Sequence, residues 1–313
     1  MSTNTNITLD IDAFINQATD LVSQQELFIT DSVVINVDDL ISEVSELISL
    51  PEVYLKIREL MDDPDSCLDD FAIVVSTDPS LIASVLKIVN SAFFGFTGQI
   101  DNVNRAINLI GIGPLHDLVL SLSALDALDL SNDIEELTLF WQRSIYCGVV
   151  SRLLAEKLLL KDAESLFVVG LLHEIGRLVL FLKYHKESKL AVIQAQTENL
   201  SLTEVEKTMF RMDYGQIGQA LMAEWNLPLK FQCVTGCHPE PDTASEYTLE
   251  TKIVHIAHRI AVNKFPEADA FQFPMDQDTL AILEISEDEI NALCVEANVI
   301  SLEVEKVILD KFS

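Results

Sequence analysis

The sequence predicts an all-α fold, built as a bundle of many short helices. Apolar residues recur at spacings of three and four along most of the chain, whereas the alternation typical of half-buried strands is almost absent. Hydrophobic residues make up 49% of the 313 residues, which is enough to bury a sizeable core. We therefore expect a multi-helix bundle, with additional helices at both ends of the chain.

Two helices are predicted in the first half of the chain. Asp78 has the residue type of an N-cap, and Pro79 that of a first helical position. Asn90 can end this helix, and Gly95 permits a sharp turn after it, in which the phenylalanines are expected to pack into the core. A second helix is expected to begin at Gly113-Pro114. The predicted inward-facing residues are Leu81, Ile82, Val85, Leu86, Val89, Leu115, Leu118, Val119 and Leu122.

More helices are predicted in the second half. Ser201, followed by Glu204, fits a capping box, and Ser165 is expected to cap the helix that carries His173. Helical spacing of apolar residues also covers three longer segments, Trp141–Lys157, Tyr247–Val262 and Ser301–Phe312.

The net charge of −30 excludes some classes of partner. With 50 acidic and 20 basic residues, the surface repels phosphate backbones and anionic membranes, so neither nucleic acid nor a membrane is expected as a partner. A well-solvated surface explains the charge more simply than a face for a basic protein partner. The N-terminus lacks the pattern of a signal peptide and no uninterrupted apolar run spans a bilayer, so we expect a cytoplasmic protein. The five scattered cysteines are expected to be reduced.

Three groups of motifs carry a family resemblance. The first runs Leu50-Pro51-Glu52-Val53-Tyr54, Asp78-Pro79-Ser80-Leu81-Ile82, Asn90-Ser91-Ala92-Phe93-Phe94-Gly95 and Ala106-Ile107-Asn108-Leu109-Ile110-Gly111. The second is Gly170-Leu171-Leu172-His173-Glu174-Ile175-Gly176-Arg177-Leu178, and the third is Trp225-Asn226-Leu227-Pro228 with Cys237-His238-Pro239. In this order and spacing they resemble the HDOD family, the HD-related output domain of bacterial signalling proteins. That family is a degenerate branch of the HD superfamily of metal-dependent phosphohydrolases.

The resemblance covers roughly Asp39 to Glu240 and implies a domain organisation. Residues 1–36 would form an N-terminal extension, and residues 37–240 the HDOD-like helical domain. Residues 241–313 would form a C-terminal helical segment that packs on the same domain.

The resemblance also implies where a metal centre would lie. In HD enzymes, imidazoles and carboxylates hold a cation that makes hydroxide near neutral pH and stabilises charge on a phosphate ester. The first histidine of that centre falls on Arg143, and the His-Asp pair on His173-Glu174. The remaining positions of the former site fall on Tyr214, His238 and His258.

Arg143 argues against a working metal centre. A guanidinium is always protonated and has no lone pair to donate, and its charge would repel a cation. We therefore expect a degenerate-site pocket without catalytic residues, metal or other cofactor, in which Arg143 pairs with Glu174. In the alternative, Arg143 points to solvent, Glu174 forms an ordinary surface pair with Arg177, and His173 is a core histidine. A metal at Cys233 and Cys237 is a weaker candidate than thiols packed as small hydrophobes.

The resemblance implies a non-catalytic signal-transduction output module, a pseudoenzyme that regulates a protein partner of unknown identity. One alternative is a metal-dependent phosphohydrolase acting on a nucleotide or cyclic dinucleotide. Another is a sensor that binds a small anionic ligand in the former active-site pocket through Arg143. The sequence leaves open whether the chain forms a homo-oligomer.

Overall fold

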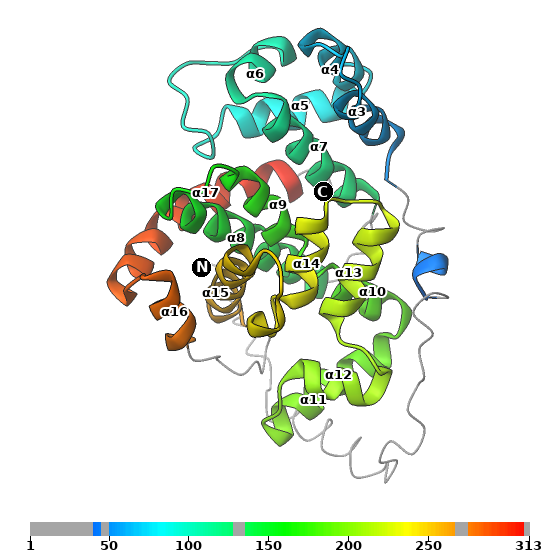
Figure 1. The fold of residues 1–313 in the computed structure, drawn as a ribbon, viewed down its shortest axis with the longest axis vertical. Coiled ribbons are helices and arrows are strands. Elements are labelled where there is room, and N and C mark those ends of the chain that lie inside the picture. Colours follow the sequence, from blue (N-terminus) through cyan, green and yellow to red (C-terminus); the bar gives the residue numbers. More distant parts are fainter. Residues whose placement is uncertain (1–39, 45–49, 128–134, 267–274, 310–313) are drawn as a thin grey trace, which may run out of the picture.

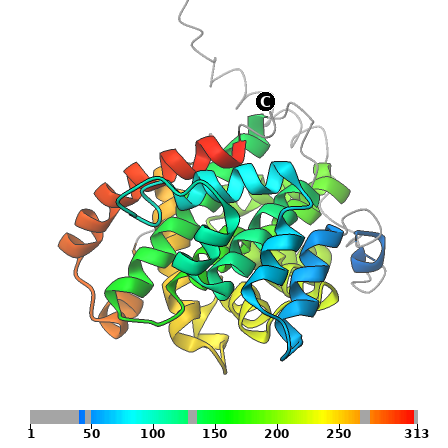
Figure 2. The same ribbon diagram turned by 90° about the horizontal axis from the view of Figure 1, so that it is seen from above.

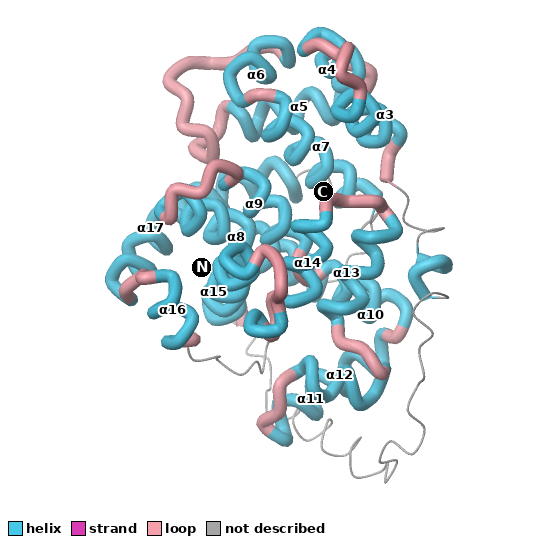
Figure 3. The backbone as a smooth tube through the Cα atoms, in the orientation of Figure 1, coloured by secondary structure: helices cyan, strands magenta, loops and turns pink. Residues whose placement is uncertain are grey.

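The computed structural model describes residues 40–44, 50–127, 135–266 and 275–309, which contain a helical segment at 40–44, the fifteen α-helices α3 to α17, one 3-10 helix and no strand (Figure 3). The predicted all-α class is therefore confirmed. The predicted N-terminal extension, residues 1–36, lies outside the described residues. The helices, labelled in Figure 1, are α3 (Glu52–Asp62), α4 (Leu68–Val75), α5 (Pro79–Val89), α6 (Val103–Ile110), α7 (Ile112–Ala127), α8 (Glu135–Lys157), α9 (Ala163–Leu172), α10 (Ile175–Lys183), α11 (His185–Glu198), α12 (Leu202–Phe210), α13 (Tyr214–Glu224), α14 (Leu229–Cys237), η1 (Pro241–Thr243), α15 (Thr248–Lys264), α16 (Gln277–Leu283) and α17 (Glu287–Leu309).

Helices α3 to α7 form one end of the molecule (Figure 1). Asp78 caps α5 by accepting hydrogen bonds from two backbone amides of the first turn, which confirms the predicted start. Asn90 ends α5, and Gly95 adopts a φ of +63°, a conformation that favours glycine. Of the phenylalanines in this turn, Phe93 is buried, whereas Phe96 is exposed, so only part of the aromatic cluster joins the core.

Helices α8 and α9 pack closely at the centre, because two glycines face each other there. A Cβ added to Gly170 would lie 2.7 Å from Ser151 Oγ and 2.8 Å from the Cα of Gly148. Of the helices that follow the HDOD-like region, α15 and α17 also pack on α8 (Figures 1 and 2). Helix α8 is thus the central element, and it carries Arg143.

Helices α11 and α12 form the other end, and α10, α13 and α14 lie between this end and the centre, where α10 packs on α13 and α13 on α14 (Figure 1). Gly176 of α10 lies directly against the backbone of α13. The capping box predicted for Ser201 and Glu204 is present at the start of α12. The predicted cap of α9 is wrong: α9 begins after Asp162, and the Ser165 hydroxyl donates to the Asp162 carbonyl instead.

Among the residues that the structure describes, one segment has the length and composition of a membrane span. Within Ala163–Lys183, which comprises α9 and α10, the most apolar stretch of 18 residues has a mean hydropathy of 1.8 despite its interruption by His173 and Glu174. Two further helix pairs are long and apolar enough only if each pair is counted as one span, and each pair is bent by more than 40°. Of the best window in Ala163–Lys183, 83% is buried inside the protein, so its apolar side chains form the core.

Candidate functional site

The candidate site lies at the break between α9 and α10. Helix α9 ends at Leu172, His173 is its C-cap residue, and Glu174 precedes the first residue of α10. The exposed fractions of His173 and Glu174 are 0% and 1%. The pair between Glu174 and Arg177 that the alternative predicted is present, but it is not a surface ion pair, because this carboxylate lies inside the protein.

Three imidazoles meet beside this break. Nδ1 of His173 lies 2.7 Å from the Gly170 carbonyl oxygen, and Nδ1 of His238 lies 2.8 Å from that of Thr235. A carbonyl only accepts hydrogen bonds, so each neutral ring carries its proton on Nδ1 and a lone pair on Nε2. Nδ1 of His258 lies 2.8 Å from Nε2 of His173 and donates to it. One ring nitrogen from each of the three histidines lies within 4.8 Å of the others.

Burial sets the protonation state of these rings. Burial lowers the pKa of His173, and it holds the pKa values of His238 and His258 well below the usual value. The three imidazoles are therefore neutral near pH 7. Nε2 of His238 is buried and has no hydrogen-bond partner, so its lone pair is unused by the protein.

Two arginines hold the carboxylate of Glu174. Oε1 lies 3.2 Å from a guanidinium nitrogen of Arg177, and Oε2 lies 3.7 Å from one of Arg143, which is itself 3% exposed. Burial by itself would raise the pKa of Glu174, but the two guanidiniums outweigh it and hold that pKa well below the usual range. Glu174 is consequently ionised and electrostatically neutralised by its neighbours. Arg143 therefore does not point to solvent.

His255, a second histidine of α15, contacts both His238 and Arg259. Nδ1 of His255 donates to the backbone carbonyl of His238 at 2.7 Å, so it joins α15 to the end of α14. Nε2 of His255 accepts a hydrogen bond from Nε of Arg259 at 2.8 Å. His255 therefore orients both the His238 backbone and the Arg259 guanidinium.

A cavity of about 410 Å³ opens beside the imidazoles. Three guanidiniums and one carboxylate line it, which gives a formal charge of +2 when the histidines are neutral. Apolar groups complete the wall, so the cavity offers both cationic and hydrophobic contacts. The lining residues that matter below are Arg143, Glu174, Arg177, Tyr214, His258 and Arg259.

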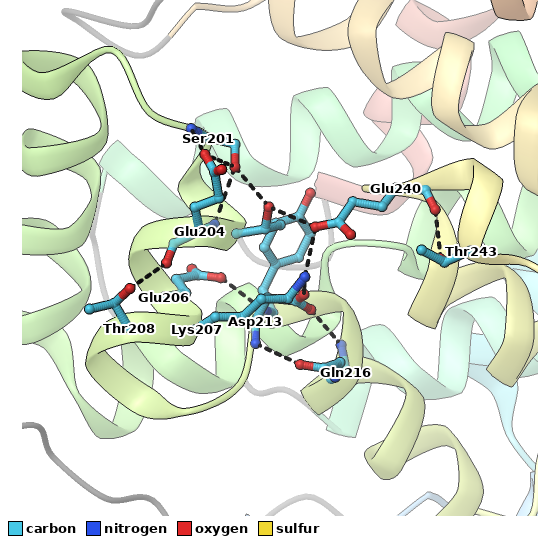
Figure 4. Close-up of polar contacts among 11 residues, drawn as sticks. Ser201, Glu204, Glu206, Lys207, Thr208, Asp213, Gln216, Glu240 and Thr243 are labelled. Carbon is cyan, nitrogen blue, oxygen red and sulfur yellow. Dashed lines mark hydrogen bonds and ion pairs between the residues drawn. The ribbon is translucent and has the colours of Figure 1, made fainter.

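A polar network fixes the turn that carries Tyr214 (Figure 4). Asp213 caps α13, and Lys207 lies 3.1 Å from Asp213 and 2.7 Å from Glu240. The buried carboxyl of Glu206 accepts a hydrogen bond from the Tyr214 amide at 2.8 Å. Burial raises the pKa of Glu206 to about 8, so this group is largely protonated near pH 7 and adds little negative charge near the cavity.

The six sequence-predicted site residues lie in one region of the structure. Arg143 faces Glu174, and the rings of His173, His238 and His258 are neighbours. The Tyr214 ring centroid lies 5.5 Å from that of His238. Three further residues, Arg177, His255 and Arg259, line the cavity but were not predicted from the sequence. Two spacings could have indicated them: Arg177 lies at i+3 from Glu174, and Arg259 lies at i+4 from His255.

The donor set decides which metal centre these residues fit. A centre that uses the carboxylate of the former His-Asp pair does not fit, because two arginines hold Glu174 and Arg143 contributes charge without a lone pair. A single ion on His173, His238 and His258 does fit, because three neutral ring nitrogens converge. The sulfur pair is a poorer match, since Cys233 and Cys237 are half-buried free thiols.

Solved structures share this fold. A candidate phosphohydrolase from Shewanella amazonensis SB2B superposes with a TM-score of 0.67 and 22% identity, covering 86% of this chain and 97% of that one. An HDOD domain protein of unknown function from Geobacter sulfurreducens also gives a TM-score of 0.67, with 18% identity, covering 87% and 97%. A candidate signal transduction protein from Marinobacter aquaeolei VT8 gives 0.66 with 20% identity, covering 96% and 68%.

Sequence comparisons agree with the fold. An uncharacterised protein of Treponema pallidum (strain Nichols) is 29% identical over 184 residues, which are 57% of this chain. The matched region spans only 35% of that relative. The HDOD domain family matches residues 47–241, more than half of the chain and close to the region predicted from the motifs. With these motifs, this fold and this match, the chain belongs to the HDOD domain family.

Proposed function

We propose that this chain works in signal transduction without hydrolysing a substrate, and that it regulates a protein partner. The placement of Glu174 carries the proposal. Its carboxylate lies inside the protein between Arg143 and Arg177, so it cannot readily act as the ligand or base that hydrolysis would require. Family membership and the likeness to a candidate signal transduction protein support the signalling role.

The expected result of an activity assay is no turnover. Purified protein is incubated with nucleotides, cyclic dinucleotides and a simple phosphodiester, with added Mn²⁺, and release of product is measured. We expect the same background rate for the wild type and for His173→Ala. Turnover well above background that His173→Ala abolishes would establish the rival function, a metal-dependent phosphohydrolase.

The cavity favours a second candidate function, a sensor for a small anion. Arg143, Arg177 and Arg259 gather around a space of ordinary ligand size, on a chain whose overall charge is −30. Such a field attracts an anion locally although the rest of the surface repels it. This function is compatible with the first, because ligand binding would be the input and a protein contact the output.

Removing one arginine tests the sensor. We expect pyrophosphate or a nucleotide to bind the wild type, and Arg259→Gln to weaken that binding about 10- to 100-fold, the effect of losing one charged hydrogen bond. Calorimetric titration gives the affinities. The matched control is Arg105→Gln, an exposed arginine of α6 outside the cavity, which should bind as the wild type does. Equal losses in both variants, or no binding to the wild type, would contradict the sensor.

A further inference from the structure

The three-histidine cluster has the donor arrangement of a metal site. His173 and His238 each anchor Nδ1 on a backbone carbonyl of their own helix, which fixes the ring and turns Nε2 inward. Metal-binding histidines commonly have this second hydrogen bond, because it sets the tautomer and the ring orientation. His255 adds another layer by holding the backbone of His238.

The unpaired nitrogen of His238 is a second, independent observation. Its Nε2 is fully buried without a hydrogen-bond partner, and a buried polar group in that state destabilises the fold because it has lost its hydrogen bonds to water. A ligand for this lone pair would remove this destabilisation. His258 lies close enough to His173 to share a ligand with it, since its Nδ1 lies 2.8 Å from Nε2 of His173.

We propose that His173, His238 and His258 together bind one transition-metal ion of the zinc, cobalt or nickel class. The donor nitrogens lie within 4.8 Å of one another, whereas two nitrogens on a tetrahedral zinc ion lie about 3.3 Å apart. Small movements of the side chains therefore suffice. When the ion binds, the proton of His258 moves from Nδ1 to Nε2, so Nδ1 changes from hydrogen-bond donor to metal ligand without any change in net charge.

The donor chemistry sets the selectivity of the site. Imidazole suits zinc, cobalt and nickel, whereas magnesium, calcium and manganese prefer oxygen ligands. The ion would join the ends of α9 and α14 to α15, and through the half-buried His258 it would contact the cavity. This site goes beyond the proposed function, which requires neither the presence nor the absence of an ion.

Metal titration of the full chain tests the site. Metal-stripped protein is titrated with Co²⁺ and with Zn²⁺, and bound metal, the visible spectrum of cobalt and the thermal midpoint are recorded. We expect one equivalent to bind, a tetrahedral cobalt spectrum, and a midpoint that rises with free Zn²⁺ because the ion binds the folded state. Mg²⁺ and Mn²⁺ should raise it much less.

Matched variants assign the ligands. His238→Gln and His258→Ala should each weaken Co²⁺ binding at least 100-fold, whereas His185→Ala, at an exposed histidine of α11, and the double variant Cys233→Ser/Cys237→Ser should bind like the wild type. His258→Ala keeps the test decisive if the buried His238 variant does not fold. The site is refuted if the wild type takes up no stoichiometric Co²⁺ or Zn²⁺, or if the histidine variants still bind one equivalent with unchanged affinity. Turnover that depends on the bound ion would instead support the site and overturn the non-hydrolytic proposal.

Discussion

Gly176→Ala is expected to destabilise the protein by at least about 3 kcal/mol, the upper part of the range for overpacking a core. A Cβ at this position would lie 2.5 Å from the backbone nitrogen of Gly218 and still closer to the carbonyl oxygen of Tyr214. Both neighbours are backbone atoms of α13, so no side-chain rotation can relieve the contact. Helices α10 and α13 must therefore separate. Urea unfolding of the two proteins measures the loss.

The same methyl group elsewhere provides the control. Gly113 lies exposed in the first turn of α7, and a Cβ there meets nothing within 4 Å. Gly113→Ala should leave stability unchanged or raise it slightly, because alanine favours the helix over glycine. If Gly176→Ala unfolds at the wild-type urea concentration, α10 and α13 are not in direct backbone contact.

The close contact at Gly176 also bears on the site. Glu174 lies two residues before it, and Tyr214 is the first residue of α13. Separation of the two helices would therefore shift the cavity wall on both sides. We expect any anion that binds the wild type to bind Gly176→Ala more weakly.

Local sequence signals predicted much of the fold. The Asp78 cap and the Ser201-Glu204 box follow from the hydrogen bonds that these side chains offer to the first turn of a helix. The cap predicted at Ser165 was wrong, because α9 begins earlier, after Asp162, and the Ser165 hydroxyl donates to the Asp162 carbonyl. The interruption of the helix at His173 and Glu174 was not predicted, because the apolar run continues on both sides of it.

The site was harder to predict, because its residues come from distant helices. Motif order pointed to the histidines of α9, α14 and α15, but not to which nitrogen each ring would present. That depends on backbone carbonyls such as those of Gly170 and Thr235. The i, i+4 spacing of Arg259 from His255 indicates that the two side chains meet, but whether they face a cavity depends on how α15 packs against α8.

Arg143→Ala is expected to cost roughly 3 kcal/mol of stability, the lower end of the range for breaking a buried ion pair. The variant leaves Glu174 buried and charged, although Arg177 remains 3.2 Å away and limits the loss. Arg143→Met with Glu174→Gln removes both charges, and it should recover much of that stability. Urea unfolding of the wild type, Arg143→Met, Glu174→Gln and the variant with both substitutions gives the coupling between the residues.

The pH dependence separates this charge effect from lost packing. The pKa of Glu174 in the folded protein lies well below its usual value of 4.5, so the ionised carboxylate contributes stability above that pH and loses it as the pH falls through the folded pKa. Without Arg143 the folded pKa rises, so acid removes a smaller contribution from the variant. The difference in unfolding free energy between wild type and Arg143→Ala should therefore be largest near pH 7 and should shrink below about pH 4.5. A difference that stays constant across this range would assign the loss to packing and refute the ion pair as its cause.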